Sequence, residues 1–499
     1  MKWTNIFKET FYISSIHLST KILGFLEKLL IAYLFGASEI SDAYFFSFSI
    51  FIIIFDFFNE STLPALLPEY VKSLKHAKKN LLNSAFSFLF TTGFIISVFI
   101  FLFSPLIIKS FSNFPPQTAK IAISYLRIIS LGIGFVIASI ATYLFINSDQ
   151  KFLPASMGDL MFKVTGTIFI LYTIINKEAG LMPLAIGIVF GSFLKLFTHI
   201  FYLKKKGSSP FPSFNSSIKR VLKLSSPMVI GVFFAKSRIL FDNYLVSGMA
   251  IGSVTALQFG YRVMEFGIVV ILEPFSTVIF PEFVRLAKKP ELFIEKISSG
   301  IKSLLIIFLP VSVLAFIFRI NIITILFGHG SFSHSDILVT SAAFSYYALS
   351  MSFICIDLLL SRSLFALGDT TFPAIFEITS ILFHVLFTLS FKQYGIHIIS
   401  LSFLLNRIIK SALLYIRLKI KTGHHLEIGH FVIKISIFIT INTIIIITLK
   451  NHFQFFREVG FASFFVLSIV FILFYFAEIF LSGISKDIMK IIKEKKDQI

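Results

Sequence analysis

Long apolar segments recur along the whole chain and are separated by short polar loops. A helix needs about 20 mostly apolar residues to cross the hydrocarbon core of a bilayer. By this measure the sequence predicts an all-α polytopic membrane protein with about fourteen spanning helices. Their expected ranges are Phe11–Phe35, Ala43–Leu67, Leu82–Ile108, Ala122–Ile146, Leu153–Ile175, Leu181–Leu203, Pro227–Val246, Val254–Phe280, Ile301–Phe318, Ala342–Leu364, Phe372–Phe391, Gly395–Leu418, Phe431–Leu449 and Phe461–Leu481.

Cationic residues are concentrated in alternate loops. The loops after the second, sixth, eighth and twelfth spans hold clusters of them, which are Lys72, Lys75, Lys78 and Lys79; Lys204, Lys205 and Lys206; Arg285, Lys288 and Lys289; and Lys419 and Lys421. The loops at 36–42 and 247–253 hold no Lys or Arg. Because cation-rich loops stay in the cytoplasm, both termini are predicted to be cytoplasmic. The basic segment 484–499 is expected to form an amphipathic helix on the inner leaflet.

The two halves of the chain resemble each other. Pro68-Glu69-Tyr70-Val71 matches Pro281-Glu282-Phe283-Val284, 213 residues later. Further matches at offsets of 215 and 220 pair Lys195, Lys204 and Lys206 with Lys410, Lys419 and Lys421, and Leu144, Phe145 and Asp149 with Leu364, Phe365 and Asp369. The offset covers six helices, an even number, so the repeats run parallel.

This repeat predicts two six-helix lobes around a central cavity. The expected division is an N-lobe at 1–206, a cytoplasmic linker at 207–218, a C-lobe at 219–421 and two extra helices at 422–483, followed by the basic tail.

Composition narrows the function classes. The chain is 56% hydrophobic and 14% charged, with a formal net charge of +19. Cytoplasmic loops that face anionic lipids account for this excess, so no nucleic-acid partner is expected. The single cysteine, Cys355, excludes a disulfide within the chain. No phosphate-binding loop or metal-ligand pattern is present, so we expect a protein that is not an enzyme and has no cofactor.

Charged residues within the predicted spans mark a candidate site. A charge near the bilayer centre costs at least about 2.5–3.5 kcal/mol, so such residues usually face a cavity or pair with one another. The first, second, seventh and eighth spans carry the densest set. The candidate cations are Arg262, Lys28, Lys21, Lys236 and Arg238, and the candidate cavity acids, suited to ion coupling, are Glu27, Asp42, Asp56, Glu60 and Glu265. Local neutralisation within Glu27–Lys28, Arg262–Glu265 or Arg238–Asp242 is the alternative for single pairs, whereas the set as a whole favours a hydrated cavity.

Residues 19–70 resemble the N-terminal signature of the MurJ (MviN) lipid II flippases. That family belongs to the multidrug/oligosaccharidyl-lipid/polysaccharide (MOP) exporter superfamily. The shared elements are Leu23-Gly24-Phe25, Phe35-Gly36-Ala37, Ser41-Asp42-Ala43-Tyr44-Phe45 and Pro68-Glu69-Tyr70. Further matches lie at Gly252-Ser253-Val254, at Tyr261-Arg262-Val263-Met264-Glu265-Phe266 and at Phe327–Phe332, so the resemblance extends over the whole chain.

The resemblance implies a flippase of the bacterial cytoplasmic membrane that carries undecaprenyl-linked peptidoglycan precursor to the outer leaflet by alternating access. The candidate cations would bind the pyrophosphate, and the last two helices would form a groove for the lipid tail. The expected partners are this lipid-linked glycan and membrane lipids, for a monomeric protein. Coupling to the membrane potential and coupling to a monovalent ion are both left open.

The chain departs from the family at several cavity positions. The family usually has Arg-Asp in place of Glu27-Lys28 and Arg in place of Phe55, Lys21 replaces a further common Arg, and only Arg262 keeps its register. We hypothesise that Lys28, Lys236 and Arg238 restore the positive cavity. These departures leave three alternatives: a flippase for another polyprenyl-linked oligosaccharide, a cation-coupled drug antiporter, and a scaffold for envelope synthesis.

Overall fold

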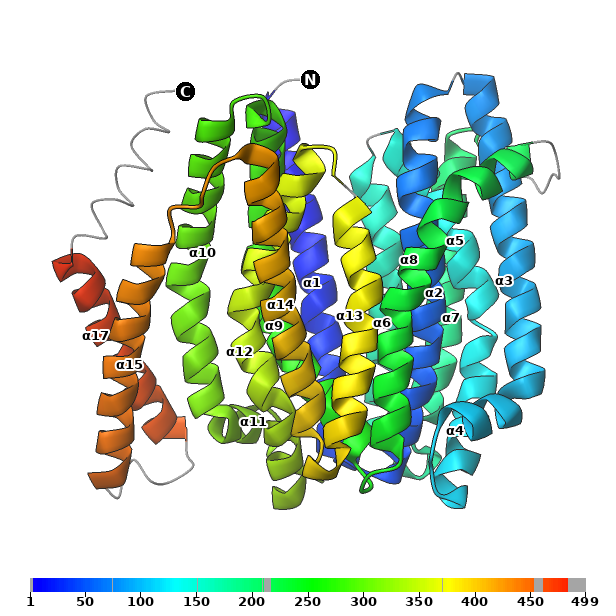
Figure 1. Cartoon of the computed structure of the whole chain (residues 1–499). Coiled ribbons are helices and arrows are strands. Elements are labelled where there is room, and N and C mark those ends of the chain that lie inside the picture. Colours follow the sequence, from blue (N-terminus) through cyan, green and yellow to red (C-terminus); the bar gives the residue numbers. More distant parts are fainter. Residues whose placement is uncertain are drawn as a thin grey trace. The chain divides into compact units, whose positions relative to one another are not determined.

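The computed structural model describes residues 3–73, 75–149, 151–208, 210, 217–369, 371–452 and 461–482, and every element within these ranges is a helix (Figure 1). Two compact units divide the chain. Unit 1 contains Met1–Gln258 and Gly330–Asp336, and unit 2 contains Phe259–His329 and Ile337–Ile499. The predicted all-helical fold is confirmed.

Unit 1 is built around α2, which contacts α4, α5 and α8. The helix α6 packs on both α7 and α1, and α3 lies against α5. The elements of this unit are α1 (Trp3–Phe35), α2 (Glu39–Lys72), α3 (Lys75–Phe111), α4 (Pro116–Ser130), α5 (Ile133–Ser148), α6 (Phe152–Ile175), η1 (Lys177–Ala179), α7 (Met182–Lys205) and α8 (Ser217–Ser247).

Unit 2 holds the remaining helices, and two of them, α9 and α12, begin with a few residues in unit 1. The last two helices dock on α10 through an apolar cluster that includes Ile306, Ile435, Phe471 and Tyr475. The elements are α9 (Ser253–Leu286), α10 (Pro290–Ile317), α11 (Arg319–Phe327), α12 (His334–Ala366), α13 (Thr371–Phe391), η2 (Lys392–Tyr394), α14 (His397–Thr422), α15 (Gly429–His452) and α17 (Phe461–Leu481).

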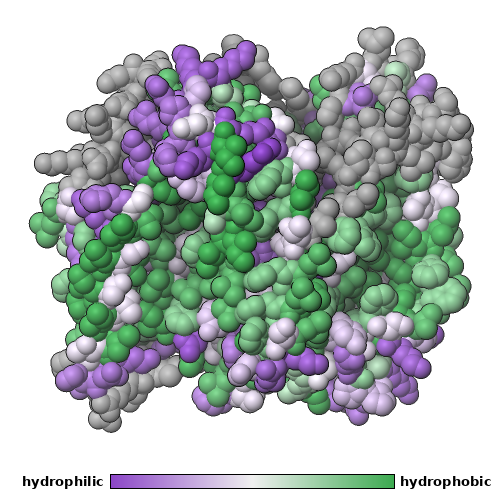
Figure 2. Space-filling view, viewed as in Figure 1, coloured by the Kyte–Doolittle hydropathy of each residue, from purple (hydrophilic) through white to green (hydrophobic). Residues whose placement is uncertain are grey.

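Eleven helical segments of the described chain are long and apolar enough to cross a membrane. The expected spans outside this set are α1, α8 and α9, which carry most of the candidate site charges. The number of fourteen spanning helices therefore stays a prediction. It is compatible with the eleven strongly apolar helical segments together with α1, α8 and α9, which carry more charge. On the face shown in Figure 2, hydrophobic side chains dominate the middle and polar ones gather at both ends, as expected of a surface in contact with lipid.

One expected span is broken. The sequence predicted a continuous helix over 122–146, whereas α4 ends at Ser130 and α5 begins at Ile133. A side chain at Gly132, within the break, would meet Ser192 on α7 at 3.0 Å. The break thus lies at a close contact with α7, and apolar periodicity alone gives no sign of it.

The internal repeat extends to the loops. Gly180 and Gly395, 215 residues apart, both have positive φ, and each directly follows a one-turn 3-10 helix, η1 and η2. The predicted lobe boundaries stay predictions, since the contacts group α8 with unit 1. The expected tail at 484–499 and most of the expected linker at 207–218 lie outside the described residues.

Two glycines of α9 face α12 at very different distances. A Cβ at Gly260 would lie 2.9 Å from the backbone nitrogen of Phe344. A Cβ at Gly267 would find only the Met351 sulfur, at 3.5 Å. The first position therefore allows a close backbone crossing, of the kind that small residues provide between membrane helices.

We expect Gly260→Ala to destabilise unit 2 by about 1–3 kcal/mol, because backbone cannot yield to the added methyl group. Gly267→Ala is the matched control on the same helix, and it should be neutral or stabilising by up to about 1 kcal/mol, since alanine favours a helix. Thermal unfolding in detergent can be followed with a fluorogenic thiol reagent, because the single cysteine, Cys355, is 1% exposed. Equal melting temperatures for both variants would contradict the close crossing.

Candidate functional site

A buried ion pair ties α1 to α6 in unit 1. Lys28 donates to Glu27 at 2.6 Å, and Lys163 on α6 lies 3.9 Å from the other carboxylate oxygen of Glu27. The Lys28 ammonium also lies over the rings of Phe45 and Phe48, at 5.4 and 5.3 Å. Glu27 and Lys28 are 4% and 5% exposed. Such a pair is closed to an incoming anion unless the surrounding helices move.

The ion pairs between α2 and α8 are more exposed than the Glu27–Lys28 pair. Lys236 on α8 reaches Asp56 at 3.0 Å and Glu60 at 2.7 Å. The Lys236 side chain is 14% exposed, but that of Glu60 is 47% exposed. This cluster has two carboxylates for one ammonium, so its formal charge is negative.

The other candidates on these helices have different surroundings. Arg238 pairs along α8 with Asp242 at 2.9 Å, and Asp242 is buried. Lys21 is exposed on α1. The predicted cations of unit 1 are therefore spread over several pairs, and the described contacts do not join them into one cluster.

The side chain of Asp42, a residue of α2, lies against the first turn of α9. One of its oxygens accepts from the Gly252 amide at 2.7 Å, and the other accepts from the amide and hydroxyl of Thr255, at 2.8 and 2.6 Å. A carboxylate here satisfies the free N–H groups of the first turn and complements the helix dipole. This geometry is that of a cap supplied by another helix, and the predicted part of Asp42 in ion coupling stays a prediction.

Arg262 and Glu265 lie in unit 2, on the face of α9 where both side chains are one-third exposed. Arg262 donates to Glu265, three residues along the same helix. Arg262 is thus a partly exposed guanidinium that pairs with a carboxylate one turn along its own helix.

A further lysine, absent from the candidates predicted from the sequence, lies beside a departure from the family pattern. Where the resembled family has an arginine, this chain has Phe55, and the ammonium of Lys195 on α7 lies 4.8 Å over that ring. Lys195 also pairs with Asp159 on α6 at 2.6 Å. The sequence signal for this lysine is its repeat match to Lys410.

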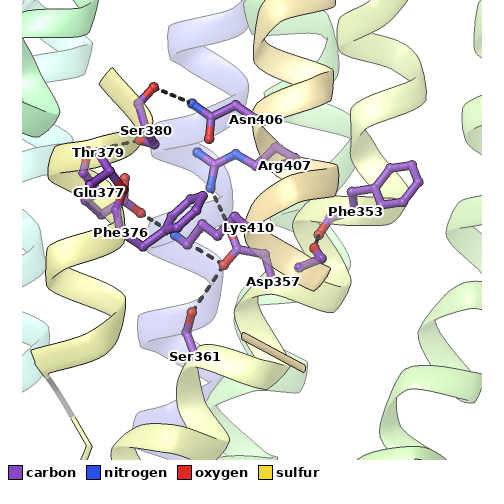
Figure 3. Close-up of polar contacts among 11 residues, drawn as sticks. Phe353, Asp357, Ser361, Phe376, Glu377, Thr379, Ser380, Asn406, Arg407 and Lys410 are labelled. Atoms are coloured by element: carbon purple, nitrogen blue, oxygen red, sulfur yellow. Dashed lines mark hydrogen bonds and ion pairs between the residues drawn. The ribbon is translucent and has the colours of Figure 1, made fainter. Parts of the chain in front are cut away.

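Lys410 stands at the matching place in unit 2 and belongs to a cluster of four charges (Figure 3). Asp357 on α12 accepts from Arg407 at 2.5 Å, from Lys410 at 3.2 Å and from Ser361 at 3.2 Å. Lys410 also donates to Glu377 on α13. Asp357 and Lys410 are buried, whereas Arg407 and Glu377 are partly exposed. The cluster therefore joins α12, α13 and α14 through a buried centre with two accessible ends.

A second repeated feature lies at the helix ends. Asp149 accepts from Lys78, and its repeat partner Asp369 accepts from Arg417 at 2.7 Å and Lys421 at 3.2 Å. Burial alone would raise the pKa of Asp369. The hydrogen bonds from Arg417, the Phe372 amide and Lys421 outweigh it and lower that pKa.

These pairs divide by accessibility. The buried ones, centred on Lys28 and Asp357, tie helices together, because a charge away from water needs a fixed partner. Arg262, Lys236 and Arg407 keep part of their surface exposed, so an anion could exchange with their carboxylate partners. Among the described residues no group of three or more His, Cys, Asp or Glu side chains could hold a metal ion.

The family model described as lipid II flippase MurJ matches residues 31–475 of this chain. Similar proteins carry the name "probable lipid II flippase MurJ". The one from Buchnera aphidicola subsp. Schizaphis graminum (strain Sg) is 28% identical over 372 residues, which are 72% of each chain. The one from Rickettsia prowazekii (strain Madrid E) is 24% identical over 479 residues, 90% of this chain and 91% of the relative.

Solved structures show the same fold. A lipid II flippase MurJ in an inward closed conformation has a TM-score of 0.81 and 24% identity, over 96% of this chain and 99% of that one. An inward-facing multidrug resistance MATE family transporter of the MOP superfamily has a TM-score of 0.69 and 12% identity, over 82% and 98% of the two chains. At these identities, the structural similarity supports the fold alone.

We expect Glu27→Gln and Lys28→Gln each to destabilise the protein by about 3–5 kcal/mol, because each leaves a buried charge without its nearest counter-ion. The double variant Glu27→Gln/Lys28→Gln should recover most of this loss. Thermal unfolding reported by Cys355 provides the measurement. Glu60→Gln, at a half-exposed pair, should change stability by less than about 1 kcal/mol. Additive losses in the double variant would show that the two charges do not depend on each other.

Proposed function

This chain belongs to the lipid II flippase MurJ family, and we propose that it moves lipid II, an undecaprenyl-pyrophosphate-linked muropeptide, from the inner to the outer leaflet. The match of the family model to residues 31–475 carries the proposal. The similarity covers 90% or more of one named relative, so it includes the helices that hold the site.

The chemistry of the site fits this substrate. A pyrophosphate offers several anionic oxygens, and guanidinium or ammonium groups bind them through charge-assisted hydrogen bonds. Arg262 is accessible, and its one-turn partner Glu265 can yield to a stronger anion. On α8, Lys236 and Arg238 are already paired with carboxylates, so they add positive charge for the substrate only if those pairs open. Lys28 supplies charge only if its buried pair opens.

Transport of this kind makes or breaks no covalent bond, so the protein acts as a transporter without a resident cofactor. The two lobes expose the site to each side of the membrane in turn. The energy source is the membrane potential or a monovalent ion, and Asp56 and Glu60 are the accessible carboxylates for such an ion. The groove for the lipid tail lies on α15 and α17, and the functional unit is a monomer in the bacterial cytoplasmic membrane.

A purified sample reconstituted in liposomes should move fluorescent lipid II between leaflets. We expect Arg262→Gln to lower the rate at least 10-fold, because a charge-assisted hydrogen bond to the pyrophosphate is worth about 1.5–3 kcal/mol. Arg319→Gln is the matched control, since Arg319 is also a partly buried arginine over a ring, that of Phe316 at 5.1 Å, but lies outside the candidate set. Intact wild-type protein that moves no lipid II would overturn the proposal.

We propose that both termini are cytoplasmic, which the distribution of Lys and Arg supports. In a Cys355→Ser background, we expect a thiol introduced by Ala250→Cys, in the loop between α8 and α9, to react with an impermeant maleimide on intact cells. The thiol from Lys205→Cys, at the end of α7, should react only after permeabilisation. Both positions are exposed. The reverse labelling pattern would invert the topology.

A further inference from the structure

Two arginines of unit 2 stand beside one aromatic contact. The ring of Tyr261 on α9 packs against Phe403 on α14, with centroids 6.2 Å apart, and both rings touch Tyr347 on α12, at 5.5 and 5.3 Å. The Arg262 guanidinium lies 6.0 Å from the Tyr261 ring, and that of Arg407 lies 4.9 Å from Phe403. The three helices therefore bring these two arginines to one part of unit 2.

The helix directions place Arg407 close to the Arg262–Glu265 pair. The chain reverses with each crossing, so α9, α12 and α14 run parallel (Figure 1). Tyr261 and Phe403 are in contact, and one turn further along each helix come Glu265 and Arg407. A turn advances both helices by about 5.4 Å. Glu265 and Arg407 therefore share one level, next to Arg262.

Arg407 is held in place but remains reachable. Its Nη1 donates to Asp357, which Lys410 and Ser361 also hold. Within the described part of the chain, this is one of the five N–H groups that a guanidinium offers. Its side chain is 26% exposed, whereas that of Asp357 is 7% exposed. The anchor is thus buried, whereas about a quarter of the Arg407 side chain is exposed.

We propose that Arg407 is a second guanidinium for the substrate's pyrophosphate, which it binds together with Arg262. The inference rests on the proposed function and assigns the diphosphate, rather than the sugar or the peptide, to this part of unit 2. Two phosphates suit two planar donors better than one, because each guanidinium can bind a phosphate through two parallel hydrogen bonds. Arg407 was not among the five candidate cations predicted from the sequence.

Binding of undecaprenyl pyrophosphate and undecaprenyl monophosphate to the full chain in nanodiscs tests the proposal. We expect Arg407→Gln to weaken binding of the diphosphate about 10- to 100-fold and of the monophosphate much less. Arg407→Lys should recover part of the loss, since it keeps the charge without the planar fork. Arg262→Gln/Arg407→Gln should lose less than the product of the two single losses, because both groups act on one ligand.

Arg417→Gln is the matched control on α14. Arg417 also pairs with a buried aspartate, Asp369 at 2.7 Å, and stacks over a phenylalanine, Phe372 at 5.3 Å, but it lies ten residues further along the helix. It should leave diphosphate affinity unchanged. Thermal unfolding of each variant shows whether it folds. If Arg407→Gln does not fold, Arg407→Lys is compared with Arg417→Gln in its place.

The outcomes separate the two proposals. Wild-type protein that neither binds the diphosphate nor moves lipid II overturns the proposed function. Wild-type protein that binds the diphosphate, with Arg407→Gln and Arg407→Lys as tight as Arg417→Gln, overturns the assignment of Arg407 alone. Equal losses for the diphosphate and the monophosphate would also overturn it, because they would show a general effect of charge.

Discussion

The cost of placing a charge in hydrocarbon governs how this bundle is assembled. Several ion pairs of the described spans join helices that are not consecutive in sequence, such as Glu27 with Lys163, Lys236 with Asp56 and Arg407 with Asp357. Each such pair selects a neighbour, because a helix that turned away would leave its charge unsolvated. Apolar packing alone selects neighbours weakly in a membrane, where lipid is as apolar as the side chains. The charges that prepare the site therefore also specify the contacts between helices.

Apolar periodicity was sufficient to predict the class of fold. Segments such as 461–481 and 182–203 could be predicted as spanning helices from their apolar composition, since a helix satisfies its own backbone hydrogen bonds in lipid. The break at Gly132 could not be predicted, because the apolar pattern continues through it and its contact with α7 is a tertiary one. Likewise, the short matches between the halves predicted the repeat, yet the grouping of α8 with unit 1 follows from tertiary contacts that sequence offsets do not encode.

The site was only partly predictable. Charge within a span marked Arg262, Lys236 and Glu27, and the local pairs Arg238–Asp242 and Glu27–Lys28 were foreseen as alternatives from their spacing. Spacing cannot tell a buried pair from an exposed one, so Lys28 and Arg262 looked equivalent. Partners on other helices, such as Lys195 over Phe55, become visible only when the helices are assembled.

The cap that Asp42 places on α9 has a consequence for how this sequence can change over evolutionary time. Two of its three bonds go to backbone N–H groups, of Gly252 and Thr255, which every residue except proline provides. Thr255 can therefore change while its N–H contact persists, but Gly252 cannot, because it has a φ of +91° and a Cβ there would lie 2.5 Å from the Ala37 carbonyl oxygen. The accepting position, Asp42, is constrained as well, since aspartate combines this short reach with a negative charge. This helix end thus depends on two positions far apart in sequence, Asp42 and Gly252, whereas Thr255 can be replaced with the loss of one hydroxyl contact.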